Sequence, residues 1–399
     1  MEKPLAALEI SSKQLKLIVG YELDGKVYVL YTLNKPYGHI VKEGKFIDVP
    51  ELNKAIASIC EIADSNVKLR INISDALVAL PPYGIQVFNS DQITTIVSED
   101  SKVSSLDVKN IYTLIRNGTY PTNSVLADII PNAYVLEDQR TFPEPPFGET
   151  SKSLKVKSKV HTLPSFIVNN YSAVVKNSGI AVRRTFVAPF AASQLLATYP
   201  EIPSDYILVD IGSEVTTVSL IGQKELYDSR FFSWGGDNIT DHIIASFNIG
   251  EEDAEKIKVM YGIDNRVMNF EAPVCTSDDG SGNEIKHYTN ELNKIIKSEL
   301  DIFIKEVDSA LNQLFNVYDS SYKRLPMVLI GGGSRLHGLV DYILPKLESE
   351  KIIPVVPKTL GARNPSYFTL LGMILIANKY PLIQEEDQAK VGSLTRNNK

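Results

Sequence analysis

Two segments in different parts of the chain repeat one arrangement, a carboxylate followed by a turn. Residues 8–12 read Leu-Glu-Ile-Ser-Ser, residues 209–213 read Val-Asp-Ile-Gly-Ser, and a second β-type run follows each. A carboxylate at the end of such a hairpin, beside a turn whose backbone N–H groups are free, suits a metal–phosphate group. We therefore expect Glu9 and Asp210 to face each other and to hold one nucleotide between two halves of the chain.

A glycine-rich turn is the next candidate for ligand contact. Gly331, Gly332, Gly333 and Ser334 follow a β-type run, and a helix is expected from about Leu339. Glycines let a backbone approach a phosphate or a purine ring, and a helix N-terminus favours negative charge. A plain glycine turn between a strand and a helix is an equally common explanation of this pattern.

A second glycine turn, Gly235-Gly236-Asp237, precedes another expected helix. Asp237 could instead be an N-cap that accepts backbone N–H bonds. Glu255 and Lys258 lie three positions apart on one expected helix face, where they could reach a ribose and a purine. Considered alone, that pair is more simply a solvated ion pair.

Other kinds of site are disfavoured by the sequence. The five histidines have no metal-ligand spacing, and the chain has neither a Gly-x-Ser-x-Gly elbow nor a P-loop, which argues against zinc chemistry and covalent catalysis. The net charge of −7 argues against general nucleic-acid binding. Two cysteines form no disulfide framework, and no signal peptide or apolar membrane segment is evident, so we expect a cytoplasmic protein.

The length of 399 residues allows two or more domains, and the apolar pattern predicts the elements that position the candidate site. Strands are expected from Leu5 to about Leu33, with a hairpin turn at Asp24-Gly25. The further expected elements are helices at 51–66 and 171–178, a strand at 181–188, a helix from Pro189 to Ala197, helices at 251–262 and 288–316 around a polar loop at 276–283, and a strand at 327–330.

Residues 84–163 differ in composition from the segments around them. Serine, lysine and proline become frequent, and the proline-rich stretch 141–148 can be neither a central strand nor a helix interior. This stretch is either a turn between strands or a ligand for an aromatic groove.

The order of these features resembles that of the actin/Hsp70/sugar-kinase superfamily. Within it the chain resembles the bacterial cell-division family FtsA over nearly its whole length, on the strings at 208–212, 234–241, 252–262, 329–339 and 365–373. The resemblance implies an α/β, actin-like fold of two duplicated ribonuclease-H-like halves. The insert at 84–163 falls where FtsA carries its extra subdomain, in place of the one found in actin.

The resemblance also implies a division of the chain into subdomains. The expected parts are a first actin-like subdomain at 1–83, continued by 164–204 and 362–383; the insert at 84–163; a second actin-like subdomain at 205–236, continued by 325–361; a small subdomain at 237–324; and a flexible tail at 384–399.

As a member of this family, the chain would bind ATP or ADP with Mg²⁺. The resemblance assigns the nucleotide to Glu9, Ser11, Ser12, Asp210, Gly212, Ser213, Thr216, Gly235, Gly236, Asp237, Glu255, Lys258, Gly331, Gly332, Gly333 and Ser334, and the metal, through water, to Asp210 and Glu9.

The phosphate-binding region departs from the family pattern. Glu9 stands where the family usually has Asp, Ser11 stands where it has Gly, and Glu214 adds an acid to the second turn. Ala188 precedes Pro189 where relatives often carry the Glu that orients the attacking water, a group commonly worth about 10²–10⁴ in rate. We therefore expect a nucleotide that is bound, with hydrolysis slow or absent.

The family binds the acidic C-terminal peptide of the tubulin-like FtsZ through the small subdomain. Its helix there usually carries Arg at the position of Glu299, so we expect Lys294, Lys297 and Lys305 to supply the positive charge instead. The resemblance further implies head-to-tail self-association, with the insert on one side of the contact, and other division partners.

The localisation implied is the division site at the inner face of the membrane. The last residues are too polar for the family's amphipathic membrane helix, so membrane contact requires a missing or a partner-supplied anchor. Two alternatives stay open: a PilM-like adaptor for a membrane-protein tail, and a small-molecule kinase of the same superfamily. Ala188 and Glu214 argue against the kinase.

Overall fold

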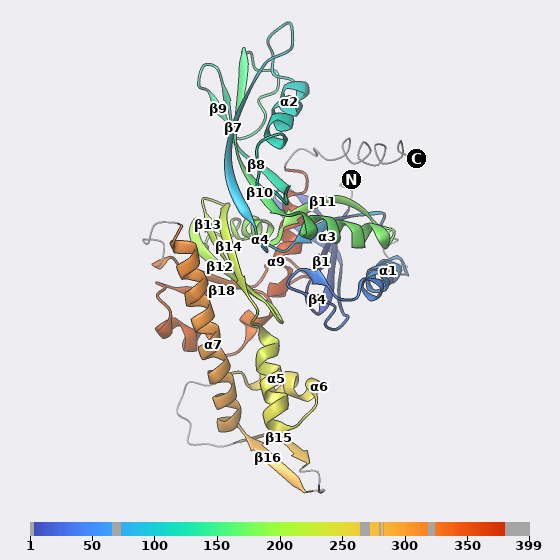
Figure 1. The fold of residues 1–399 in the computed structure, drawn as a ribbon, viewed down its shortest axis with the longest axis vertical. Coiled ribbons are helices and arrows are strands. Elements are labelled where there is room, and N and C mark those ends of the chain that lie inside the picture. Colours follow the sequence, from blue (N-terminus) through green and yellow to red (C-terminus); the bar gives the residue numbers. More distant parts are fainter. Residues whose placement is uncertain are drawn as a thin grey trace.

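The computed structural model describes residues 4–65, 73–263, 272–278, 281, 283–317 and 324–379. The predicted tail at 384–399 lies outside these residues. Figure 1 shows an elongated molecule with a narrow inserted sheet at the top, two halves side by side in the middle, and a smaller helical part at the bottom.

The first half is built on a five-stranded sheet of order β11-β6-β1-β2-β3. Its strands are β1 (Leu5–Ile10), β2 (Gln14–Leu23), β3 (Lys26–Pro36), β6 (Asp75–Leu80) and β11 (Ala181–Val187). The expected hairpin turn at Asp24-Gly25 is confirmed, and both residues have positive φ. A two-stranded hairpin, β4 (Val41–Lys42) and β5 (Lys45–Phe46), precedes α1 (Val49–Ser65).

The second half repeats this plan. Its sheet has the order β14-β13-β12-β17-β18, made of β12 (Asp205–Ile211), β13 (Thr216–Gly222), β14 (Glu225–Phe232), β17 (Met327–Ile330) and β18 (Ile352–Pro354). In both sheets three antiparallel strands from consecutive hairpins are followed by two parallel ones. The predicted duplication is therefore confirmed at the level of strand order and direction.

Two helices pack between the sheets and fix the halves to each other. α4 (Ala188–Leu196) contacts β12 and β14, whereas α9 (Phe368–Ile376) contacts β1 and β2 and lies directly on α4. The crossing is close because Gly372 has no side chain: a Cβ there would lie 1.9 Å from the carbonyl oxygen of Ala191. The N-terminus of α4 is thereby held at the floor of the space between the halves.

The insert has a sheet and a core of its own. β7 (Gln86–Thr95), β10 (Ser153–Pro164), β8 (Ser124–Leu136) and β9 (Thr141–Phe142) pair in that order, and α2 (Ser105–Arg116) packs on β7 and β10. Its buried cluster runs from Val103 to Val160 without residues of either half, so we propose that 84–163 is a separate subdomain. The proline-rich stretch begins as β9 and continues as a turn.

The helix predicted at 171–178 starts earlier than expected. α3 spans Ser165–Asn177 and begins directly after Pro164, whose φ of −50° suits the residue before a helix. The predicted helix was too short because Ser165–Asn170 carry few apolar residues on the buried face. Ile167 alone is fully buried there.

The small part of the second half contains α5 (Gly236–Phe247), α6 (Glu251–Tyr261), α7 (Thr289–Phe315) and the hairpin β15 (Pro273–Asp278)–β16 (Glu284–Tyr288). The expectation of a polar loop at 276–283 is wrong in part, because β15 continues to Asp278. Its residues are half-exposed on an edge hairpin, where polar side chains are tolerated. α7 buries one apolar stripe: Leu292, Ile296, Leu300, Phe303, Val307, Leu311 and Leu314.

The chain after β17 forms short elements that return to the first half. They are η2 (Gly332–Arg335), α8 (Leu339–Ile343), η3 (Leu344–Lys346) and η4 (Pro365–Tyr367). The helix predicted from about Leu339 is confirmed. Among the described residues, no helix combines the length and the apolar character needed to cross a bilayer.

Candidate functional site in the cleft between the halves

The two carboxylate hairpins face each other across a cavity of about 620 Å³. Thirteen of the predicted site residues line it: Glu9, Ser11, Ser12, Asp210, Gly212, Ser213, Gly236, Asp237, Glu255, Lys258, Gly331, Gly332 and Gly333. The expected convergence of the hairpins and the glycine turns on one site is therefore what the structure shows.

Three predicted site residues lie behind the cavity wall and shape it. The Thr216 hydroxyl donates to the carbonyl of Trp234 at 2.8 Å, and the Ser334 hydroxyl donates to the carbonyl of Gly331 at 2.8 Å. Gly235 passes so close to the second turn that a Cβ there would lie 2.3 Å from the carbonyl oxygen of Ser213. These residues hold turns in place and do not face a ligand.

A buried lysine pairs with one of the two carboxylates and acts electrostatically on the other. Lys16, the cross-strand partner of Glu9, places its ammonium 2.9 Å from Glu9 Oε1 and 3.3 Å from the Ser366 carbonyl oxygen. Burial alone would lower the pKa of Lys16, but the charges of Glu9 and Asp210 outweigh it, and the pKa is raised. Burial also raises the pKa of Asp210 to about 6, with Lys16 opposing the rise and Glu9 adding to it.

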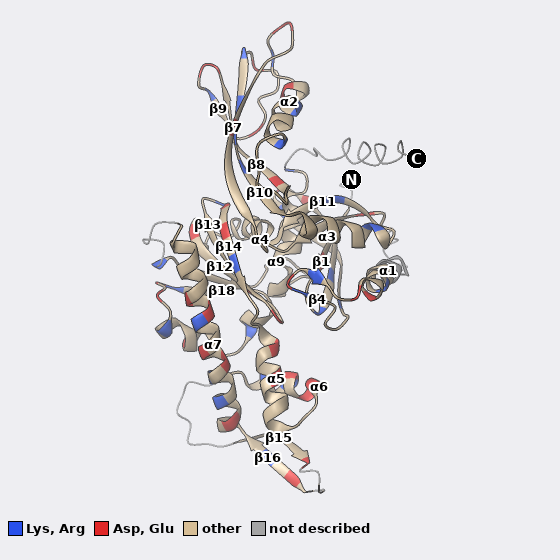
Figure 2. Cartoon of the chain, viewed as in Figure 1, with Lys and Arg blue, Asp and Glu red and all other residues tan. Residues whose placement is uncertain are grey.

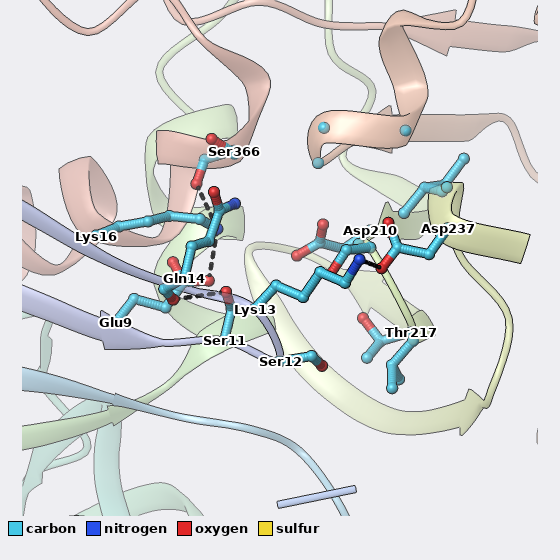
Figure 3. A pocket seen from close by; sticks show the side chains of 18 of the residues that line it. Glu9, Ser11, Ser12, Lys13, Gln14, Lys16, Asp210, Thr217, Asp237 and Ser366 are labelled. Carbon is cyan, nitrogen blue, oxygen red and sulfur yellow. Dashed lines mark hydrogen bonds and ion pairs between the residues drawn. The ribbon is translucent and has the colours of Figure 1, made fainter. Parts of the chain in front are cut away.

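A second lysine spans the cleft. Lys13, in the turn between β1 and β2, lies 2.8 Å from Asp237 Oδ2 and 3.1 Å from Glu251 Oε1, both in the second half. Figure 3 shows its side chain extended along the cavity between the first turn and Asp237. The hydrogen bond with Lys13 lowers the pKa of Glu251, whereas burial raises the pKa of Asp237 despite the same lysine.

The position of Glu214 in the second turn predicts that it faces the cavity, but its side chain turns away from it. It is not one of the described lining residues, and its carboxylate contacts the ring of His39 from the first half. His39, Glu214 and Asp237 place ligand-capable atoms within 4.8 Å of one another. The ammonium of Lys13 already neutralises Asp237 there, and the cluster serves as a cross-cleft contact.

Glu255 and Lys258 form more than a solvated pair. The Lys258 ammonium donates to the Gly236 carbonyl at 3.0 Å and to the Thr240 hydroxyl at 2.8 Å, and the Thr240 hydroxyl donates to Glu255 at 2.8 Å. The Lys258 side chain is only 9% exposed. This network ties α6 to the start of α5 and presents both side chains to the cavity.

The glycine turn after β17 is required by close packing. Gly331 has a φ of +85°, and a Cβ there would lie 2.3 Å from Asp210 Oδ1. A Cβ on Gly333 would lie 2.3 Å from the side chain of Ile211. Both positions therefore need glycine to let this turn reach the second hairpin.

The floor of the cavity lacks a polar group where α4 begins. Ala188 and Pro189 line the cavity, and Tyr83 lines it as well. Burial raises the pKa of Tyr83 well above its usual range, so its hydroxyl stays protonated. A side chain that could orient a water at position 188 is absent, as the sequence indicated.

Lys13, Lys16 and Ser366 were missed by the sequence reasoning. A signal was available for Lys16, because it is a single charge inside the apolar run 15–19, and a buried lysine needs a counter-ion. The partner of Lys13 lies far along the chain, in α5 and α6, and no local pattern could indicate it.

The three lysines predicted to bind a partner lie along α7 (Figure 2). Lys294 and Lys305 are exposed and Lys297 is half-buried. Asp301, between Lys297 and Lys305, pairs with Lys346 at 2.5 Å and accepts from the Tyr342 hydroxyl at 2.8 Å. Lys346 thus neutralises the acid, and the positive charge of this face comes from the three lysines of α7.

Glu299 does not face this surface, contrary to expectation. Its carboxylate lies 2.8 Å from His242 Nδ1 and accepts from Trp234 Nε1 at 3.3 Å. The side chain is 12% exposed. A carboxylate held in this way offers little repulsion to an acidic partner on the lysine face.

Comparisons with known proteins agree with this architecture. The sequence model of the family "Cell division protein FtsA" matches residues 207–372. The chain is 23% identical over 373 residues to the FtsA of Enterococcus hirae, covering 92% of this chain and 81% of the relative. It is 24% identical over 383 residues to the FtsA of Bacillus subtilis, covering 95% and 84%.

Solved structures show the same fold. The PilM–PilN type IV pilus biogenesis complex matches with a TM-score of 0.61 at 19% identity, covering 96% of this chain and all of the other. MreB5 of Spiroplasma citri bound to AMPPNP matches with a TM-score of 0.53 at 14% identity, covering 98% of each. The fold is therefore the predicted actin-like one, and the sequence is similar to those of FtsA cell-division proteins.

Proposed function

We propose that this chain is a division protein that holds a purine nucleotide with Mg²⁺ as a structural ligand, self-associates, and links FtsZ to the membrane or to the division machinery. The single observation that carries the nucleotide is the pair of carboxylate hairpins facing one cavity, with the glycine turn at its edge. Its volume of about 620 Å³ is within the usual range for small-molecule and cofactor sites.

The residues at the phosphate end fit a hydrated divalent cation. Glu9 Oε2 is buried without a hydrogen-bond partner, and burial, with the charge of Glu9 adding to it, raises the pKa of Asp210. Mg²⁺ would neutralise phosphate oxygens here, held through water by Glu9 and Asp210. Lys16 holds Glu9 through an ion pair of 2.9 Å, and the remaining backbone N–H groups of the two turns would bind the phosphates.

The adenosine end is the network of Glu255 and Lys258 with the glycine turn. A crystal structure with ATP and Mg²⁺ tests the whole assignment: we expect phosphates between the hairpins and the base beside Gly331–Gly333. The assignment is refuted if the chain binds no purine nucleotide either with or without Mg²⁺.

Hydrolysis is proposed to be slow or absent because nothing at position 188 can orient a water. Phosphate release should stay near background in the wild-type chain and rise in Ala188→Glu. Steady release from the wild-type chain that Asp210→Ala abolishes would contradict a purely structural nucleotide.

The partner surface is proposed to be the lysine face of α7. An acidic FtsZ tail peptide would be attracted to Lys294, Lys297 and Lys305. Lys297→Glu should weaken binding of the peptide in a fluorescence-anisotropy titration, whereas Lys286→Glu, an exposed change on β16, should not. Equal affinities for both variants would move the site elsewhere.

Self-association is proposed to use the insert. Ile93, Val97, Leu106 and Phe147 are exposed apolar side chains of this subdomain. Phe147→Glu should abolish the nucleotide-dependent rise in light scattering if the insert forms one side of a head-to-tail contact.

A PilM-like role predicts a different partner. The likeness to the PilM–PilN complex shows the fold alone, so a pull-down decides between the two roles. Retention of an FtsZ tail peptide supports the division protein, and retention of a pilus membrane-protein tail with no FtsZ binding supports the adaptor.

A further inference from the structure

Lys13 lies across the phosphate end of the cleft and connects the two halves (Figure 3). It belongs to the turn after β1, whereas Asp237 lies in the first turn of α5 and Glu251 is the first residue of α6. The ammonium is within 2.8 Å of Asp237 and 3.1 Å of Glu251. One cation therefore serves two carboxylates on the opposite half.

The same ammonium faces the cavity. Lys13 lines it together with Ser11, Ser12, Gly212 and Ser213, the turn residues that the proposed phosphates would touch. The Lys13 side chain is 19% exposed and the Glu251 side chain is 68% exposed. Glu251 can thus be released into water at little cost, while Lys13 stays in the cavity.

We propose that Lys13 is an exchangeable counter-ion, which a nucleoside di- or triphosphate takes from Glu251 and Asp237 when it fills the cleft. This inference rests on the proposed nucleotide site and adds to it a coupling between phosphate binding and the contact of the two halves. Phosphate and carboxylate oxygens compete for the same three ammonium protons. The bridge between the halves and the binding of phosphate are therefore linked, and each weakens the other by the same factor.

Removing the exposed competitor should strengthen phosphate binding. Glu251→Gln should tighten ATP and ADP about two- to fivefold, the range of one exposed ion pair. Adenosine, which has no phosphate, should bind the variant and the wild-type chain equally. Glu252→Gln is the matched control, because this exposed neighbour on α6 makes the same change of net charge.

Removing the cation should have the opposite effect. Lys13→Gln should weaken ATP and ADP by about tenfold or more, the size of a hydrogen bond to a charged group. In the Lys13→Gln chain, Glu251→Gln should then change nothing, because no ammonium is left to compete for.

The test is a set of competition titrations against a fluorescent nucleotide, with adenosine, ADP and ATP, on these variants of the full chain. Unchanged or weaker ATP binding in Glu251→Gln, or an equal gain for adenosine, would overturn the exchange. If the wild-type chain binds none of the three ligands, the proposed nucleotide site fails and not merely the role of Lys13.

Discussion

The two hairpins share one backbone plan and carry opposite charges at one equivalent position. Glu9 lies opposite Lys16 in the β1–β2 register, and Asp210 lies opposite Thr217 in the β12–β13 register. Counting from these acids, Lys13 of the first turn corresponds to Glu214 of the second. The two copies therefore have the same backbone, and their turns differ in charge so that one complements the other.

This complementarity operates across the cleft. Lys13 reaches Asp237 of the second half, and Glu214 reaches His39 of the first half. Lys16 is the counter-ion of Glu9 and also lies beside Asp210, whose own hairpin provides no cation. The site is therefore electrostatically complete only when the halves are together.

Of the substitutions in the two hairpins, the loss of Lys16 should lower the free energy of unfolding most. Lys16→Met leaves Glu9 and Asp210 without their shared buried cation, and we expect the free energy of unfolding to fall by about 3–5 kcal/mol. Urea unfolding near neutral pH measures it. The control Lys26→Met, on an exposed side chain of β3, should change it by less than about 0.5 kcal/mol. A similar small change in both variants would show that Lys16 is not the common counter-ion.

The second prediction concerns the pH dependence that Asp210 creates. Its pKa is about 6 in the folded chain against an ordinary 3.8, so the folded state holds the proton more tightly. This contribution to stability is full below about pH 4 and is lost as the pH rises through about 6, a change on the order of 2–3 kcal/mol. Asp210→Asn should remove this slope from the stability curve. Parallel curves for the two proteins between pH 4 and 7 would contradict it.

Alanine substitutions compare the two turns directly. Ser11 N–H donates to the Gln14 carbonyl, and Gly212 N–H donates to the Val215 carbonyl in the same way. A Cβ on Gly212 would lie 2.7 Å from the Val215 oxygen, so Gly212→Ala should cost about 1–3 kcal/mol. Ser11→Ala loses only the hydroxyl bond to Gln14 and should cost about 0.5–1 kcal/mol. Thermal unfolding measures both, and the reverse order would mean that the turns differ in backbone.

The smallest expected effect is that of Glu214. Its charge lies near the phosphate end but points at His39, so Glu214→Gln should tighten ATP only about two- to threefold by removing a screened repulsion. Isothermal titration at low and high salt measures the effect, which should shrink as salt rises. A salt-independent gain would indicate a rearranged turn.

The fold could be predicted from the sequence because its strongest signals are local. The paired carboxylate hairpins and the Gly331–Gly333 turn each show in a few consecutive residues. Lys13 could not be assigned, since its partners Asp237 and Glu251 belong to the other half. The contacts of Glu299 could not be predicted either, because its neighbours His242 and Trp234 come from a distant segment.

The strands of the insert have a mechanical consequence. Lys159 of β10 pairs with Glu225 of β14 at 3.2 Å and lies over the Tyr227 ring, so the base of the insert rests on the second half. At about 3.3 Å per residue, the part of β10 beyond Lys159 is a lever of roughly 20 Å, and a tilt of about 5° at this contact moves its far end by about 2 Å. In an assembly joined through that end, the displacement caused by a small closure of the cleft would be repeated in every subunit. If the proposed self-association uses that end, the pitch of the assembly would then depend on how many subunits hold the proposed nucleotide.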